Sequence, residues 1–310
     1  MECREVIKTL NMNKDEWLEY RRRGIGGSDI AAICGLNKYK TAFDVYLDKI
    51  GKGKEYQESE AAYFGTLFEE AVAKEFSKRS GKKVRNKNSI LAHKDFDFMF
   101  ANVDRLIVGE KAGLECKTAS EYVKSKWSDD NIPMDYMLQC QWYMAVTGYK
   151  KWYIAVIIGG NKFEYKEIDR DEDIIENIIS IAKDFWENHV LKHIPPSLDG
   201  SEAADETLKQ LYPNAISNSV LQLNKDIIPK IERIKELKEK IKELTEEVKT
   251  HENQIKDVLK NNEIGVIEDY QVTWKNQVRV SFDSKGFKTE YPDIYNSFVK
   301  KTSFRKFEIK

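Results

Sequence analysis

The spacing of apolar residues predicts two amphipathic helices in the first half of the chain. In the stretch 64–81 apolar residues recur at helical spacing, and a glycine ends the pattern. The stretch 133–148 has the same spacing, begins at a proline and ends at a glycine, which are the residues that favour helix starts and stops. Each stretch is therefore expected to be a helix with one apolar face.

Two strand-like runs and a third helix follow. The runs cover 150–160 and 162–170, and a long amphipathic helix is expected over 171–192. This order predicts an α/β (α+β) core with a mixed central sheet flanked by helices. The chain then passes through a Pro-Pro pair followed by Ser, Asp and Gly, so residues 1–200 form the expected first domain.

Residues 201–310 are expected to form a C-terminal extension. The stretch 226–262 carries apolar residues in alternating steps of three and four, which is the heptad pattern of coiled coils, and His251 interrupts it. Either two such helices pair between subunits or one packs back on its own chain. Residues 263–310 are predicted to form a small β/α unit with a strand pair, a short helix and a last basic strand, suited either to DNA contact or to an interface. The apolar heptad positions are Ile234, Leu237, Ile241, Leu244, Val248, Ile255 and Val258.

Two acids and a lysine follow the strand-like run FMFAN. Two glycines bracket a turn after Asp104, so a hairpin is expected to bring Asp104 beside Glu115. Residues i and i+2 of a strand share a face, so Glu115 and Lys117 point together while Cys116 points the other way. Two neighbouring carboxylates repel each other unless a cation lies between them. Such hard oxygen ligands suit Mg²⁺ or Mn²⁺, although acid-x-lysine on a strand is by itself a common pattern.

The two predicted helices carry further candidate residues. Glu69 and Glu70 lie in the apolar half of the first helix, where a carboxylate is costly to bury unless it is paired or binds a metal. Gln139 and Tyr143 are four residues apart on the second helix, so they lie one above the other. An amide and a phenol on one face are suited to orienting a water and a phosphate, or simply to helix packing.

The N-terminal segment RRRGIGGSD is typical of a phosphate-binding turn. Its glycines let the backbone approach a ligand closely, and Ser28 with Asp29 forms a strong expected N-cap for a short helix. A helix start preceded by glycines favours a bound phosphate, and Arg21 supplies a forked donor to it.

Together these motifs resemble the PD-(D/E)XK nuclease superfamily and, more closely, the phage lambda exonuclease and YqaJ-type viral recombinase family. The resemblance rests on Gly-x-x-x-Glu on a helix, an aspartate, acid-x-lysine and a helix with glutamine and tyrosine, and it extends over residues 15–196. Trp17, Arg21 and Ser28 also fall in register with the family signature. It implies a restriction-endonuclease-like core, and it favours Glu69 over Glu70 without settling between them. The implied catalytic residues are Glu69, Asp104, Glu115, Lys117 and Gln139.

The resemblance also implies how the site works. One ion is expected on Asp104, Glu115 and the main-chain carbonyl of Cys116, and a second on Asp104 and Glu69. Lys117 is expected to orient the attacking water and to offset charge at the phosphorus. Arg21 and Ser28 are implied to hold the 5′-terminal phosphate of DNA, with Arg23 and Tyr143 as further DNA-binding residues.

The function implied is a Mg²⁺- or Mn²⁺-dependent 5′→3′ exonuclease on double-stranded DNA ends. It leaves 3′ overhangs for a single-strand annealing protein in phage-type recombination, and family members close into a homotrimer, one of several assemblies open to this chain. The alternatives are a restriction-like endonuclease with the same chemistry and a non-catalytic DNA-binding scaffold. An exonuclease that needs an end leaves closed circular DNA intact, whereas an endonuclease cuts it. A protein that binds no Mg²⁺ or Mn²⁺ is not such a nuclease, which would leave the scaffold.

Composition changes this picture little. The 310-residue chain has a formal net charge of -1, which argues mildly against a nucleic-acid partner, but its basic residues are clustered, and local patches govern phosphate contacts. The cysteines and the absence of a membrane-spanning pattern indicate the compartment. The four cysteines are scattered without a C-x-x-C pair, which indicates a reducing compartment. With no signal peptide and no long apolar run, the chain is expected to be cytoplasmic, in a bacterial or phage-infected cell, with no membrane partner.

Overall fold

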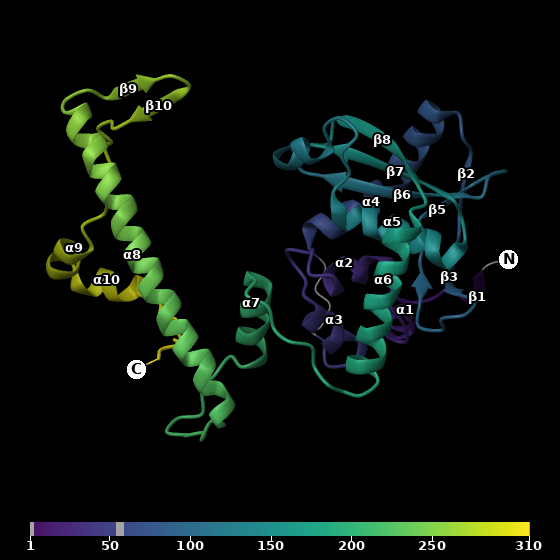
Figure 1. The fold of residues 1–310 in the computed structure, drawn as a ribbon, viewed down its shortest axis with the longest axis horizontal. Coiled ribbons are helices and arrows are strands. Elements are labelled where there is room, and N and C mark those ends of the chain that lie inside the picture. The colour runs from purple at the N-terminus through teal and green to yellow at the C-terminus, as the bar shows by residue number, and fades with distance from the viewer. Residues whose placement is uncertain (1–2, 54–58, 310) are drawn as a thin grey trace. The chain divides into compact units, whose positions relative to one another are not determined.

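The computed structural model describes residues 3–53 and 59–309, which divide into two compact units between Leu211 and Tyr212. Figure 1 labels the elements of both units along the chain. The first unit contains β1 (Cys3–Lys8), α1 (Lys14–Arg22), α2 (Gly27–Ile33), α3 (Ala42–Lys49), α4 (Glu60–Ser80), β2 (Val84–Asn86), β3 (Ser89–His93), β4 (Phe100–Ala101), β5 (Arg105–Ile107), β6 (Ala112–Ala119), the 3-10 helix η1 (Glu121–Trp127), α5 (Met134–Thr147), β7 (Lys151–Ile158), β8 (Lys162–Asp169), α6 (Glu172–Asp184), the π-helical turn η2 (Phe185–Val190) and α7 (Glu202–Leu211).

A five-stranded mixed sheet organises the first unit. Among the described residues its order is β2-β5-β6-β7-β8, with β6 and β7 parallel and the other neighbours antiparallel. The central strand β7 is apolar and almost wholly buried, as expected for a strand covered on both faces. The parallel pair requires a crossover, and α5 supplies it. The predicted mixed sheet flanked by helices is therefore confirmed.

The two faces of this sheet pack on different helices. On one face, Tyr153 and Ala155 of β7 join Val72 and Phe76 of α4 in a small apolar cluster. On the other face, alternate residues of β7 such as Ile154 join α5, α2 and α6 in the main core. The register between β6 and β7 is unbroken from Ala112↔Lys151 to Ala119↔Ile158. Each side chain of β6 therefore lies on the same face as its partner on β7.

Helix α4 differs from its sequence-based description in one respect. Its buried side chains, Val72, Ala73 and Phe76, all lie in its C-terminal half. Phe64, Leu67 and Phe68 were expected on the packed face but are exposed. The helical period was predicted correctly, but in the first turns it is Gly65, not these apolar side chains, that faces Thr118 of β6.

The predicted first domain was expected to end near residue 200. In the structure the first unit continues through α7, where the buried Thr207 donates its hydroxyl hydrogen to Asp44 of α3. Within the described ranges, no helix is both long enough and apolar enough to cross a membrane.

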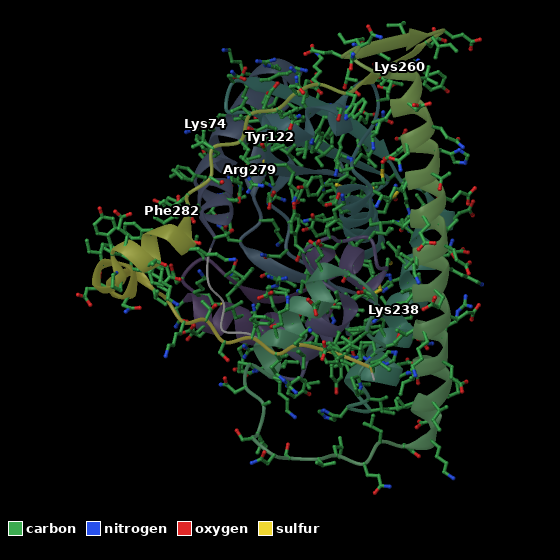
Figure 2. The ribbon with its side chains drawn as sticks, turned by 90° about the vertical axis from the view of Figure 1, so that its left-hand side faces the viewer. Lys74, Tyr122, Lys238, Lys260, Arg279 and Phe282 are labelled. Atoms are coloured by element: carbon green, nitrogen blue, oxygen red, sulfur yellow. The ribbon has the colours of Figure 1, made fainter. Side chains whose placement is uncertain are left out.

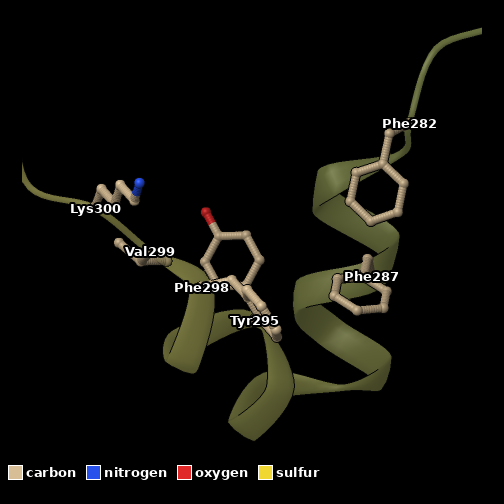
Figure 3. Close-up of a pocket in the computed structure, with 6 residues that line it drawn as sticks. All are labelled: Phe282, Phe287, Tyr295, Phe298, Val299 and Lys300. Atoms are coloured by element: carbon tan, nitrogen blue, oxygen red, sulfur yellow. The ribbon is translucent and has the colours of Figure 1, made fainter.

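The second unit contains a long helix, a hairpin and a pair of short helices. One short helix and a last basic strand were expected after the hairpin, but the structure has two short helices there, and residues 299–309 carry neither helix nor strand. The two short helices enclose a shallow aromatic pocket of about 350 Å³ with a lysine at its rim (Figure 3). The elements are the 3-10 turn η3 (Lys225–Ile227), α8 (Ile228–Leu259), β9 (Ile264–Ile267), β10 (Tyr270–Thr273), α9 (Ser284–Glu290) and α10 (Pro292–Phe298).

Candidate functional site

The hairpin β5–β6 brings the two predicted acids together. Arg105 pairs with Leu114 across the antiparallel strands, so Asp104 and Glu115 are the next opposed positions. The turn between the strands contains Gly109 at φ +84°, a conformation that glycine adopts without strain. The Asp104 Oδ2 atom accepts the main-chain N–H of Cys116 at 2.8 Å. This bond fixes Asp104 against the strand that carries Glu115.

Glu115 and Lys117 share the sheet face that packs on α5, where Gln139 and Tyr143 lie. The Lys117 Nζ atom lies 2.6 Å from Glu115 Oε1 and donates to Gln139 Oε1 at 3.1 Å. The Gln139 amide nitrogen donates to the same Glu115 oxygen at 2.7 Å and to the Tyr143 hydroxyl at 2.8 Å. The i and i+4 spacing on α5 thus closes a hydrogen-bonded network onto acid-x-lysine. Cys116 points to the opposite face, beside the α4 cluster.

The charged side chains of Glu115 and Lys117 in this network are largely shielded from solvent. Burial raises the pKa of Asp104 well above its usual value, and the negative charges of Glu115 and Glu69 raise it further. Burial by itself lowers the pKa of Lys117, but the charges of Glu115 and Asp104 more than offset this, so the pKa lies above its ordinary value. The Lys117 ammonium therefore persists at neutral and alkaline pH. Among the described residues, the buried Glu115 Oε2 atom has no hydrogen-bond partner.

Glu69 and Glu70 of α4 both pair with Arg105, the residue that follows Asp104 in the chain. Arg105 forms an ion pair with Glu69 and donates to Glu70 Oε2 at 3.0 Å. Glu69 is the more buried of the two, and its charge acts on Asp104. Within the described part of the chain, no group of three or more His, Cys, Asp or Glu side chains is arranged to hold a metal ion. The structure thus brings Asp104 and Glu115 together, while Glu69 is bound to Arg105.

The glycine-rich turn places Arg21 beside Ser28, though with a different cap from the one expected. Helix α2 is capped by Gly26, whose N–H donates to Asp29 Oδ2 at 3.2 Å, and Ser28 is already within the helix. The Ser28 hydroxyl is therefore available to accept from Arg21 Nη2 at 2.8 Å. The Arg21 guanidinium also stacks on the Trp17 ring, 4.7 Å from its centroid.

Below this pair, Asp29 is the centre of a buried charge cluster. Lys49 of α3 lies 2.7 Å from Asp29 Oδ2, and both side chains are fully buried. Lys40 lies 2.8 Å from Asp29 Oδ1 and is partly exposed, while Arg21 lies 3.7 Å away. Burial opposes the charge on Asp29, but Lys40, Lys49 and Arg21 hold its pKa well below the usual value. We call Arg21, Ser28, Asp29 and Lys40 the cradle. Its two cations, with the buried Lys49 as a third, surround one carboxylate, so the cradle has a net positive charge.

A close contact joins the cradle to the hairpin site. A Cβ atom added at Gly27 would lie 2.6 Å from the Tyr143 ring and 3.1 Å from the Gln139 side chain. Only a glycine lets α2 approach α5 this closely. Tyr143 was predicted to contact DNA, but the structure places it in the core, where it bonds to Gln139.

Four further charged residues lie in these segments of the chain: Arg23, which was predicted, and three that the sequence motifs missed. Arg23 was predicted as a further DNA-binding residue; it is exposed, lies over the Tyr20 ring and donates to Glu19 at 3.3 Å. Two of the missed residues are charged side chains inside apolar stretches, which is the signal that marks them: Lys49 follows Val45-Tyr46-Leu47 on a buried helix face, and Arg105 stands within NVDRLIV. The third stands in the polar run NKYKT and has no such signal. The missed residues are Lys40, Lys49 and Arg105.

Comparison with known proteins fixes the family. Residues 16–150 match the model of the YqaJ-like viral recombinase domain, a span that includes Arg21, Asp104 and Gln139. The chain is 49% identical over 308 residues to the uncharacterized protein YqaJ of Bacillus subtilis (strain 168), covering 98% of this chain and 97% of that protein. The chain belongs to the YqaJ family. The family predicted from the sequence motifs is thereby confirmed.

Two solved structures are similar to this YqaJ-family chain. An alkaline exonuclease (LHK-Exo) from Laribacter hongkongensis aligns with a TM-score of 0.49 at 16% identity, covering 64% of this chain and 100% of that one. A phage-related exonuclease from Haemophilus somnus 129PT aligns with a TM-score of 0.42 at 15% identity, covering 55% of this chain and 96% of that one.

Proposed function

We propose that this protein is a Mg²⁺- or Mn²⁺-dependent 5′→3′ exonuclease that digests double-stranded DNA from its ends. One observation carries the proposal: a buried glutamate, with one oxygen unpaired among the described residues, is bonded to a lysine and a glutamine and lies beside a second, half-buried acid. This arrangement suits phosphodiester hydrolysis, which needs a metal-bound water, a positive charge at the phosphorus and groups that hold both in place. Membership of a viral recombinase family supports DNA as the substrate.

The donor set fits a divalent cation. Asp104 and Glu115 offer hard carboxylate oxygens, and the unpaired Oε2 of Glu115 is a buried acceptor that a cation would satisfy. The repulsion that raises the pKa of Asp104 would be relieved in the same way. The Cys116 carbonyl is the proposed third donor, with water and phosphate oxygens completing the shell. Glu69 would join a second ion only after leaving Arg105.

The chain's own residues then carry the chemistry around that ion, which supplies Lewis acidity and an acidified water. Lys117 remains protonated, so it acts as a fixed charge that orients the water and offsets the charge at the phosphorus, not as a base. Gln139 fixes the side chains of Glu115 and Lys117 relative to each other, and its hydrogen bond to Tyr143 fixes Gln139 itself. The 3′ overhang that remains is the proposed substrate of a single-strand annealing protein, in the cytoplasm of the bacterial or phage-infected cell.

The cradle is the proposed site of the 5′-terminal phosphate. Arg21 and Ser28 offer a guanidinium and a hydroxyl on one side of α2, and Lys40 adds a second partly exposed cation. The contact between Gly27 and Tyr143 connects this anion site to the hydrolytic site through packed side chains. Digestion would therefore begin at a 5′ end and proceed toward the 3′ end.

End-labelled DNA tests the function. Linear duplex labelled at either 5′ or 3′ ends, with and without a 5′-phosphate, is incubated with Mg²⁺ beside a closed circle. We expect release of the 5′ label first, faster digestion of 5′-phosphorylated ends and an intact circle. Cutting of the circle would instead identify an endonuclease, and absence of cutting with all substrates would refute the hydrolytic function.

The Lys40→Ala variant tests the cradle separately. Loss of one partly exposed cation is expected to reduce the preference for 5′-phosphorylated over 5′-hydroxyl ends by roughly three- to tenfold, mainly through KM. The measurement is kcat and KM on both duplexes. Lys209→Ala, which removes an exposed lysine paired with Asp205 on α7, is the matched control and should leave the preference unchanged. An unchanged preference in Lys40→Ala would remove Lys40 from the phosphate site.

A further inference from the structure

Helix α8 presents an apolar stripe to solvent along most of its length. It is a single helix of 32 residues, Ile228–Leu259, and its side chains stand out along its whole length in Figure 2. The stripe follows strict steps of three and four residues, so its members occupy the a and d positions of a heptad repeat. The exposed members of the stripe have relative exposures from 40% at Leu237 to 80% at Val258, and Ile234 at its N-terminal end is half-buried. We call the stripe the seam; its a positions are Ile234, Ile241, Val248 and Ile255, and its d positions are Leu237, Leu244, His251 and Val258.

We propose that the seam pairs with the seam of a second copy of this chain, in an antiparallel two-stranded coiled coil. In the antiparallel arrangement each a residue packs on a d residue of the other copy. Centring the overlap on the middle of the seam sets Leu244 against Val248 of the second copy, with Ile234 against Val258 at each end. Every layer except the two that contain His251, one from each copy, is then apolar on both sides.

The charges beside the seam decide the orientation. In a parallel coil each g residue faces an e residue five positions further along the other copy. This would set Arg233 against Lys238 and Glu247 against Glu252, each twice, and all four contacts would be between like charges. In the antiparallel coil e faces e and g faces g, so Lys238 meets Glu252 twice, and the single like-charge contact is Glu247 with its own copy. Charge complementarity therefore selects a second copy in the antiparallel sense.

The polar position in the seam fits the same orientation. In a parallel coil His251 would face His251 of the other copy, whereas in the antiparallel coil it lies against Ile241. The His251 Nδ1 atom lies 3.3 Å from Gln254 Oε1, so the ring already has a polar partner on its own helix. It can therefore tilt toward the edge of the interface without losing that partner.

The test is the association of the full-length protein, measured by sedimentation velocity over a concentration series at low ionic strength. The parent chain is expected to associate, and Leu244→Glu at the centre of the seam is expected to abolish that association. Leu244 is 60% exposed in the single chain, so this change does not disturb the fold of one copy, which circular dichroism verifies.

Charge-reversal variants test whether the partner helix belongs to a second copy and whether the two helices run antiparallel. Lys238→Glu and Glu252→Lys should each weaken association by about tenfold, and the double variant should restore it. In a parallel coil the same single changes would strengthen association, because each converts a like-charge contact into an opposite one. Glu239→Lys, at an outward-facing f position, is the control and should have no effect. Strengthening by the single variants, a monomeric parent, or association that Leu244→Glu leaves intact would each overturn the proposal. None of these outcomes depends on nuclease activity.

Discussion

The Lys117→Ala variant is expected to bind linear duplex DNA with nearly the parent affinity and to cut it at least about a hundredfold more slowly. Lys117 is the positive charge bonded to both Glu115 and Gln139, and the phosphates bound elsewhere along the DNA do not depend on it. Binding is measured by a gel shift in Ca²⁺, and cutting by release of a 5′ label in Mg²⁺.

A control separates this effect from a general loss of positive charge. Lys162→Ala removes an exposed lysine that pairs with Glu164 at the edge strand of the same sheet, and it should cut at the parent rate. Equal cutting by Lys117→Ala and the parent protein would exclude the proposed role of the lysine.

The Glu115→Gln variant is expected to lose both Mn²⁺ binding and cutting, by at least about a hundredfold in rate. The substitution keeps the size of the side chain but removes the charge, and with it the buried carboxylate ligand of the proposed cation. Titration calorimetry with Mn²⁺ measures the binding directly, without DNA.

Glu110→Gln is the matched control for this titration, because Glu110 lies in the turn of the same hairpin but pairs with Lys82 away from the site. It should bind Mn²⁺ as the parent does. If the parent protein binds no Mn²⁺ or Mg²⁺, or if Glu115→Gln binds as well as the parent, the acids are not a metal site and the non-catalytic scaffold becomes the better account.

The parts of the site that could be predicted are those governed by local periodicity. The two-residue period of a strand put Glu115 and Lys117 on one face, and the turn glycines put Asp104 opposite them. The helical period likewise placed Gln139 over Tyr143. These relations depend on neighbours in sequence, so the structure reproduces them.

What could not be predicted depends on contacts between distant segments. The partner of Asp29 is Lys49 on another helix, and the partner of Glu69 is Arg105 on the hairpin. No spacing rule connects such pairs. The same limit applies to the first turns of α4: the sequence shows an apolar stripe but not which of its side chains are buried in the fold.

The approach of α2 to α5 has a consequence for variation at two positions. Because residue 27 and residue 143 occupy one another's space, neither can change size alone. A relative with alanine or serine at position 27 must carry a narrower side chain than tyrosine at position 143, or its glutamine would be displaced from the acid. Substitutions at the two positions are therefore expected to arise as a pair.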